Sequence, residues 1–285
     1  MAAASTTSRP IPRSAHFVFG LRRQDEPFHL VHYLAIASCA AVLDPVEIHL
    51  HCHDLPYGIY WELARPMVHL HRVDRPDIAD RSYDDAFVAR YSYAHEADVV
   101  RLDALARHGG VYADIDTLFV HEPPADFWDE ECVIGREPDV VDQSTGTRRS
   151  SLSNALVMAR PGSRYITEWR DRIEDAFDGS WSAHSCFLAD DLARAMPEHV
   201  RVEPERTFHH FPPTPGGLRR LLVDHETALD GVVSIHLAAH LWWEERRTDF
   251  VDAVHARTID EDWVRSRSTT YADAAARFLP DHGLF

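Results

Sequence analysis

The segment that decides the fold is EADVVRLDALARHGGVYADIDTLFV, which runs from Glu96 to Val120. The pattern over residues 92–108 predicts a helix. Gly109-Gly110 follows it, as is typical of the left-handed turn that ends many helices. The apolar run over 111–120 then predicts a strand. A helix that leads directly into a buried strand indicates an α/β fold.

The flanking sequence repeats this alternation of strand and helix. Short apolar or alternating runs predict strands, and apolar residues at helical spacing predict two further helices. The predicted strands cover residues 16–20, 46–51, 67–71, 154–158 and 232–236, and the predicted helices cover 30–43 and 166–177. We therefore expect an α/β fold with a mostly parallel mixed central sheet flanked by helices. Residues 137–151, a mobile surface loop, and residues 211–217 are predicted to be irregular because they are rich in polar and turn-forming residues.

No change in composition marks a domain boundary. We expect residues 1–13 to form a flexible N-terminal tail and residues 14–285 to form a single domain. The tail lacks the apolar core of a signal peptide, and the longest apolar stretch, residues 30–43, is too short to span a bilayer. The four cysteines include no C-x-x-C pair and are too few for a disulfide scaffold. These features predict a reduced, cytoplasmic protein without an integral membrane segment.

The composition excludes several classes of function. The 285-residue chain has 46 acidic and 29 basic residues, which gives a formal net charge of -17. A chain this acidic repels nucleic acid and anionic membranes, so neither is an expected partner. All 29 basic residues are arginines, which rules out a Schiff-base lysine and a lysine-containing phosphate loop and favours a GC-rich, bacterial genome. The sequence does not indicate an oligomeric state.

Two aspartates in the decisive segment predict a metal site. In a strand, Asp114 and Asp116 point to the same side, while Ile115 points the other way, into the core. Two neighbouring carboxylates repel each other unless a cation lies between them, and an oxygen-preferring divalent cation such as Mg²⁺ or Mn²⁺ fits. Asp98 and Arg101 lie one turn apart on the preceding helix, and an arginine beside a metal can bind a diphosphate or a sugar.

The spacing of these residues resembles a known family. Residues 98–116 follow the pattern D-x-x-R-x-x-x-L-x-x-x-G-G-x-Y-x-D-x-D, which is similar to the sugar-binding region of the D-x-D glycosyltransferases. These include the family-32 enzymes, such as yeast-type α-mannosyltransferases and α-1,4-galactosyltransferases, and the core of the clostridial glucosylating toxins. The resemblance implies a GT-A (Rossmann-like) fold and a metal-dependent, retaining sugar transfer.

The resemblance also implies a set of site residues. It makes Asp116 the main metal ligand with Asp114 beside it, and it adds Asp98 and Arg101 to the catalytic set. Weaker similarities cover the opening strand, where Phe19 replaces a family tryptophan that lies near the nucleotide base, and the Ser153-Asn154 stretch near the donor sugar. The expected donor-binding residues are Phe17, Val18, Phe19, Asp98, Arg101, Tyr112, Asp114, Asn154 and Trp242.

A third metal ligand is expected near the C-terminus. Residues 235–243, IHLAAHLWW, resemble the family's H-x-x-x-x-S-W or H-x-W ending. His236 with Trp242 fits the longer pattern, and His240 with Trp242 fits the shorter one. His236 is preferred and His240 is the alternative, although Leu241 replaces the serine of the longer pattern. A neutral imidazole is a suitable ligand for Mn²⁺.

The predicted function is therefore a metal-dependent, retaining glycosyltransferase. It moves a sugar from a nucleotide-sugar donor, with a UDP-sugar favoured over a GDP-sugar, to an acceptor hydroxyl such as that of a small molecule or natural product. Mn²⁺ or Mg²⁺ is the expected cofactor. Since no side chain stands out as an enzymic nucleophile, a front-face mechanism, in which the leaving phosphate helps to deprotonate the acceptor, is preferred to a covalent intermediate.

Two alternatives remain open at this point. One is a nucleotidyltransferase on a related sheet, although Gly20-Leu21-Arg22-Arg23 offers only one glycine where a glycine-rich loop is expected. The other is a non-enzymic zinc-binding or sugar-binding protein built on His49, His51 and His53, because imidazoles that alternate along one strand face can bind zinc.

Overall fold

A seven-stranded mixed sheet forms the centre of the molecule. The computed structural model describes residues 9–76, 78, 83, 86–142, 145–243 and 255–281. The sheet order is β3-β2-β1-β4-β7-β6-β8, and four of the six pairings are parallel while β7 runs antiparallel to β4 and β6. The strands are β1 (Ser14–Val18), β2 (Glu47–Cys52), β3 (His69–Arg72), β4 (Gly110–Ala113), β6 (Cys132–Val141), β7 (Arg148–Ala159) and β8 (Arg201–Glu203). The predicted α/β class and mostly parallel mixed sheet are confirmed.

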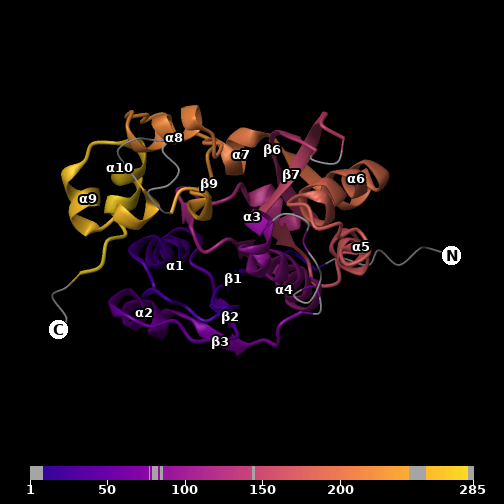
Figure 1. Ribbon diagram of the computed structural model, residues 1–285, viewed down its shortest axis with the longest axis horizontal. Coiled ribbons are helices and arrows are strands. Elements are labelled where there is room, and N and C mark those ends of the chain that lie inside the picture. Colours follow the sequence, from indigo (N-terminus) through magenta and orange to yellow (C-terminus); the bar gives the residue numbers. More distant parts are fainter. Residues whose placement is uncertain are drawn as a thin grey trace.

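Helices cover both faces of this sheet (Figure 1). Alternate strand residues enter different apolar clusters, Phe17 on the side of α1 and Val18 on the side of α4, so these helices lie on opposite faces. Figure 1 shows α8, α9 and α10 together on the side of α1, and α5 and α6 beside β6 and β7. The helices are α1 (Leu30–Leu43), α2 (Ile59–Ala64), α3 (Ala86–Ala89), α4 (Ser92–His108), α5 (Arg164–Arg172), α6 (Leu188–Ala195), α7 (Glu205–His209), α8 (Pro215–Leu222), α9 (Glu261–Ser266) and α10 (Thr270–Ala276).

The glycine pair after α4 joins that helix to the sheet as expected. The Gly109 N–H donates to Leu105 O, and both glycines have positive φ, +66° and +100°. A Cβ on Gly110 would lie 2.6 Å from the carbonyl oxygen of Ser14 on β1. Glycine therefore allows the left-handed turn and the close pairing of β4 with β1.

The predicted strand over 111–120 is in fact two strands separated by a turn. β4 ends at Ala113, the Thr117 N–H donates to Asp114 O, and β5 (Thr117–Phe119) pairs antiparallel with β9 (Ser234–His236) in a separate two-stranded sheet. Ile115, expected in the core, is only partly buried and lines a cavity. The alternation of side chains along a strand does not extend to these residues, because the turn interrupts the strand.

Three other local predictions also need correction. Residues 137–151 are not a surface loop, because β6 and β7 extend through most of this range and Glu137 pairs with Ser151 across them. The polar residues in this range belong to strands, and side chains such as those of Ser151 and Glu137 hydrogen-bond across the two strands. Within 211–217, predicted as a loop, α8 already begins at Pro215. Residues 1–8 of the predicted tail lie outside the described residues, and Ile11 is buried, with its N–H donating to Trp128 O.

Histidines on β1, β2 and β3 form a ladder of paired rings. His16 Nδ1 lies 3.1 Å from His51 Nε2, and His49 Nδ1 lies 2.9 Å from His71 Nε2. His53 leaves this row, since its Nδ1 faces a backbone carbonyl just beyond β3. His49, His51 and His53, the histidines of the zinc alternative, are thus not brought together as one ligand set. Instead, His51 pairs with His16 and His49 pairs with His71.

The ladder predicts a loss of stability in acid. Burial, reinforced by the neighbouring imidazoles, lowers the pKa of both His16 and His51 to about 3. From pH ~6.5 down to ~3 the unfolded chain therefore binds protons that the fold does not, so stability falls as the pH falls. Each such histidine removes up to about 2 kcal/mol between pH 8 and pH 5. Urea unfolding at both pH values should show a smaller loss for His51→Gln than for the wild type. The exposed-site variant His69→Gln should behave as the wild type, and equal losses in all three proteins would contradict this account.

Candidate active site

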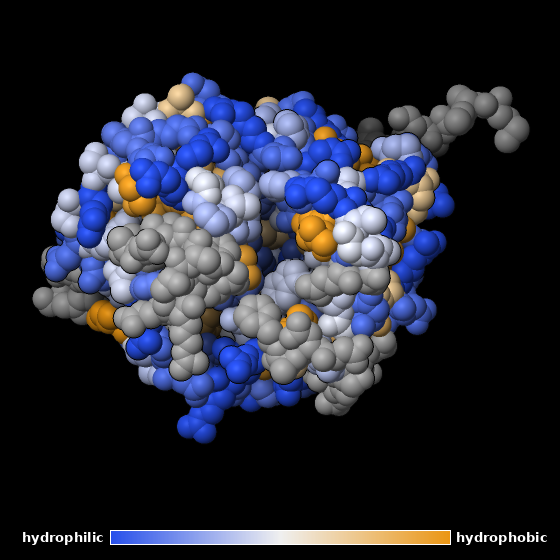
Figure 2. All heavy atoms as spheres, turned by 45° about the horizontal axis from the view of Figure 1, so that its top comes forward, coloured by the Kyte–Doolittle hydropathy of each residue, from blue (hydrophilic) through white to orange (hydrophobic). Residues whose placement is uncertain are grey.

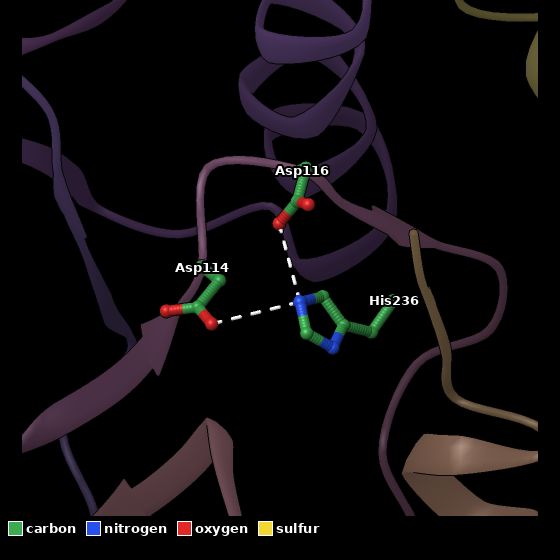
Figure 3. Close-up of side chains that lie close together, drawn as sticks. All are labelled: Asp114, Asp116 and His236. Atoms are coloured by element: carbon green, nitrogen blue, oxygen red, sulfur yellow. Dashed lines mark ion pairs between the residues drawn. The ribbon is translucent and has the colours of Figure 1, made fainter. Parts of the chain in front are cut away.

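Two carboxylates and one imidazole meet where the turn after β4 lies beside the last residue of β9. The turn after β4 carries Asp114 and Asp116, and β9 pairs with β5 so that His236 lies opposite Thr117. His236 Nε2 lies 3.6 Å from Asp114 Oδ2 and 3.3 Å from Asp116 Oδ1 (Figure 3). One ligand atom from each of the three lies within 4.8 Å of the others, and the described residues contain no other such group of three. Strand pairing thus unites residues more than a hundred positions apart.

The electrostatics of this trio favour a positive charge between the carboxylates. Burial alone would raise the pKa of Asp116, but His236 and the Ala239 N–H, 2.7 Å from Asp116 Oδ2, outweigh it and lower the pKa. Burial would lower the pKa of His236, but Asp116 outweighs this and raises it. Burial raises the pKa of Asp114, which Arg101 partly offsets. A proton on His236 and a bound cation thus compete for the same place.

The donor set fits a divalent cation. Carboxylate oxygens are the preferred ligands of Mg²⁺ and Mn²⁺, and a neutral imidazole is acceptable to Mn²⁺. Within the described residues His240 does not belong to this group, and its ring stacks on Trp181 at a centroid distance of 5.1 Å and an interplanar angle of 23°. The geometry therefore favours His236 over His240 as the third ligand.

A buried ion-pair network lies beside the trio. Arg101 Nη2 lies 2.9 Å from Asp98 Oδ1 and 3.2 Å from Asp114 Oδ1, and its Nη1 donates to the backbone carbonyl of Asn154. Its guanidinium also lies over the ring of Tyr112, 4.5 Å from the centroid. The buried arginine thus connects α4, β4 and β7 and holds Asp114 beside Asp116 and His236.

Asp98 is more enclosed than the sequence suggested. It is 6% exposed, and Asn154 Nδ2 donates to its Oδ1 at 2.8 Å, the same oxygen that pairs with Arg101. Its Oδ2 lies 3.0 Å from His184 Nε2. Asp98 was expected among the donor-binding residues, and the structure surrounds its carboxylate with three protein groups.

These residues line one wall of a cavity of about 490 Å³. A hollow is visible in the middle of the largely hydrophilic face in Figure 2. Most of the expected site residues line the cavity: Val18, Phe19, Asp98, Arg101, Tyr112, Asp114, Asp116, Asn154, His236 and His240. The structure therefore brings these ten expected residues, which are scattered along the sequence, to one cavity.

Two expected donor-binding residues do not line the cavity. Phe17 is fully buried on the α1 side of the sheet, because strand alternation turns it away from Val18. Trp242 is 1% exposed, and its Nε1 donates to Leu237 O at 2.8 Å. The neighbouring Trp243 lines the cavity in its place and stacks on His32 with an interplanar angle of 3°.

The sequence analysis missed several residues around the cavity. His32 belongs to an ordinary apolar helix, and His184 lies 86 positions from Asp98, the residue it contacts. Neither belongs to a recognisable local pattern. Tyr91 and Tyr93 also line the cavity from the start of α4. Only the packing of α1, α4 and the segment before α6 identifies them.

Comparison with known proteins connects this site to an enzyme family. Residues 52–134 match the family described as the glycosyltransferase sugar-binding region containing the DXD motif. The chain is 32% identical over 204 residues to glucan organizing enzyme 1 of Cryptococcus neoformans, covering 70% of this chain and 54% of that protein. It is 26% identical over 196 residues to glycosyltransferase afumC of Aspergillus fumigatus, covering 62% and 50%. The chain spans about half the length of these relatives, which are fungal and do not confirm the expected bacterial origin.

Solved glycosyltransferase structures also show similarity. The galactosyltransferase LgtC, in complex with donor and acceptor sugar analogues, is 14% identical with a TM-score of 0.47, and the match covers 95% of this chain and 98% of that chain. PaToxG glycosyltransferase is 17% identical with a TM-score of 0.41, covering 66% and 71%. Separately, none of the helices in the described ranges combines the length and apolar character needed to cross a bilayer.

Proposed function

We propose that the chain transfers a sugar from a nucleotide-sugar donor to an acceptor hydroxyl, because residues 52–134 match the glycosyltransferase sugar-binding region that contains the DXD motif. We further propose that the transfer depends on a metal ion, uses a UDP-sugar as the donor and retains the anomeric configuration of the sugar. One observation carries it: Asp114, Asp116 and His236 converge on one point of the cavity wall, next to Arg101. The mixed sheet agrees with the GT-A arrangement that the resemblance implies.

In this proposal each group has a distinct task. Asp116, Asp114 and neutral His236 hold a divalent cation, Mn²⁺ or Mg²⁺. When bound, such an ion supplies positive charge for a diphosphate and for the nucleotide that leaves. Arg101 adds a fixed positive charge and keeps Asp114 in place. A buried charge of this kind needs no reorientation as negative charge develops on the leaving group.

The cavity wall also supports a front-face mechanism over a covalent intermediate. Cys186 lines the cavity, but burial raises the pKa of its thiol well above the ordinary range, so it remains a weak, protonated nucleophile. Asp98 and Asp114 are held by Arg101. We therefore propose that the leaving phosphate, rather than a side chain, accepts the proton of the acceptor hydroxyl.

The aromatic end of the cavity is proposed to hold the nucleotide base. Phe19 and Trp243 both line the cavity, and each contacts His32, at centroid distances of 4.8 and 5.6 Å. A flat apolar surface suits the face of a base. The absent family tryptophan would thus be replaced by Phe19 together with Trp243.

Ligand-induced stabilisation tests this function. A ligand that binds the folded state raises its melting temperature, so we expect UDP-sugars with Mn²⁺ to raise it, and either component alone to raise it less. The same mixtures should show slow hydrolysis of the donor. No shift and no hydrolysis with any UDP- or GDP-sugar in the presence of Mn²⁺ would refute the proposal.

A pair of variants tests the metal ligands. Since His236 shares its ion with Asp116, His236→Ala should weaken Mn²⁺-dependent UDP binding about tenfold or more by isothermal titration. His240→Ala, a matched change four residues away on the same cavity, should weaken it much less. A larger loss from His240→Ala would instead assign the third ligand to His240.

A further inference from the structure

We propose that His184 is a positioning residue for the donor-sugar side of the cavity, which acts by holding Asp98 and, through it, Arg101. This inference rests on the proposed function, because Arg101 is assigned there to the donor. His184 was not among the residues expected from the sequence. It lies in a π-helical turn, Ala183–Phe187, directly before α6. Single π-helical turns are often found at functional sites.

The contact between His184 and Asp98 is fully enclosed. His184 has no exposed surface, and its Nε2 lies 3.0 Å from Asp98 Oδ2. Its own backbone is fixed, because Trp169 Nε1 donates to His184 O at 3.2 Å. The His95 ring packs against the His184 ring nearly at right angles, with centroids 4.6 Å apart. The imidazole is thus held on all sides and cannot turn away from the carboxylate.

The hydrogen-bonding chemistry determines the tautomer. An ionised carboxylate only accepts, so the Nε2 of His184 must carry the proton. Its Nδ1 is buried, with no hydrogen-bond partner within the described part of the chain. A proton on Nδ1 would be an unpaired buried donor, so the geometry favours the tautomer that carries its proton on Nε2.

Among the described residues, this bond is the one that holds Oδ2 of the Asp98 carboxylate. Arg101 and Asn154 both bond to Oδ1, whereas the interaction found at Oδ2 is that with His184. Without His184 the Asp98 carboxylate would keep a buried, unpaired oxygen and could rotate. Arg101 bridges Asp98 to Asp114, so a rotation would displace the guanidinium beside the metal ligands.

The position of His184 separates this role from catalysis. Its chain neighbours Ser185 and Cys186 line the cavity, but His184 is not part of the wall. It therefore supports Asp98 from the protein interior without reaching a bound substrate. Mutation of a group that supports a metal ligand typically lowers activity about 10- to 100-fold. We expect a loss of this size when a residue that orients Asp98 is removed.

Three variants test this role. His184→Leu removes the donor and should lower the kcat/KM of Mn²⁺-dependent UDP-sugar hydrolysis about 10- to 100-fold. His184→Gln keeps an N–H donor at a similar reach and should recover kcat/KM to within about threefold of the wild type. His16→Leu removes a buried imidazole that does not line the cavity, and it should keep most of the activity. Equal losses in the leucine and glutamine variants of His184, at unchanged melting temperatures, would overturn the proposal, as would an equal loss in His16→Leu.

A measurement on the resting protein separates this inference from the proposed function. In ¹⁵N-histidine-labelled protein at pH 7, NMR should show a slowly exchanging Nε2–H signal that disappears in His184→Gln. A wild-type His184 protonated on Nδ1 alone would overturn the inference, whatever the activity. Absence of sugar-nucleotide hydrolysis in the wild type, with the Nε2–H signal present, would refute the proposed function while the His184–Asp98 contact remained. Should His184→Leu fail to fold, the glutamine variant and the NMR signal decide the question.

Discussion

Asp116→Asn is expected to abolish Mn²⁺-dependent turnover, lowering kcat/KM by about 100-fold or more, while the protein stays folded. Asp116 is the carboxyl group of the trio whose ionised form is favoured, because His236 and the Ala239 N–H lower its pKa despite burial, whereas burial raises the pKa of Asp114. An amide of the same shape offers one neutral oxygen in place of a carboxylate. That oxygen can still accept the Ala239 N–H, which joins the turn after β4 to the segment after β9.

A comparison with Asp116→Ala separates the two tasks of this side chain. The alanine variant also removes the acceptor of the buried Ala239 N–H, so it should lose about 1–3 kcal/mol of stability in addition to activity. Steady-state kinetics with Mn²⁺ titration and urea unfolding measure both effects. Normal turnover and a normal metal titration in Asp116→Asn would reject Asp116 as the main ligand.

Arg101→Lys should lower kcat/KM about 100-fold and should not behave as a conservative change. The planar guanidinium addresses three acceptors at once, Asp98, Asp114 and the Asn154 carbonyl, while its face covers Tyr112. A lysine ammonium is shorter and has no flat face, so it cannot reach all three in this geometry. The acceptor left unpaired should cost a further 1–3 kcal/mol, about the size expected for a buried polar group.

The control is Arg107→Lys, which changes an exposed arginine on the same helix. It should leave both kcat/KM and the unfolding midpoint close to the wild-type values. Donor kinetics and urea unfolding of both variants decide the matter. If Arg101→Lys keeps most of its catalytic efficiency, the guanidinium acts only as a charge and its planar contacts do not matter.

Local patterns in the sequence were sufficient for the core of the fold. Residues 30–43 form α1 and residues 92–108 form α4 as predicted, and their C-terminal ends are set by Asp44-Pro45 and by Gly109. The paired glycines at 109 and 110 occupy the positive-φ positions that the motif implied. The longer strands were less predictable. Glu137 and Ser151 look like loop residues in isolation, and only their pairing across β6 and β7 makes them strand residues.

The sequence indicated some residues of the candidate site correctly and left others undecided. Asp98, Arg101, Asp114 and Asp116 belong to one continuous motif, so their spacing along α4 and β4 was enough to nominate them. His236 was nominated by resemblance, with His240 as an open alternative. The antiparallel pairing of β5 with β9 brings His236, rather than His240, to the aspartates. Phe17 and Trp242 were nominated incorrectly, because a motif does not tell which neighbour faces the cavity.

By itself the sequence determined the chemistry available to this protein: two aspartates two positions apart, an aspartate–arginine pair on the preceding helix, and no lysine to replace that arginine. These are properties of near neighbours, whose relative positions follow from bond geometry and helix periodicity. The tertiary structure decided which distant groups complete the site. His184 reaches Asp98, and His236 reaches Asp116, only because α6 and β9 pack where they do. Such contacts depend on burial and strand pairing summed over the whole chain, and no short stretch of sequence encodes them.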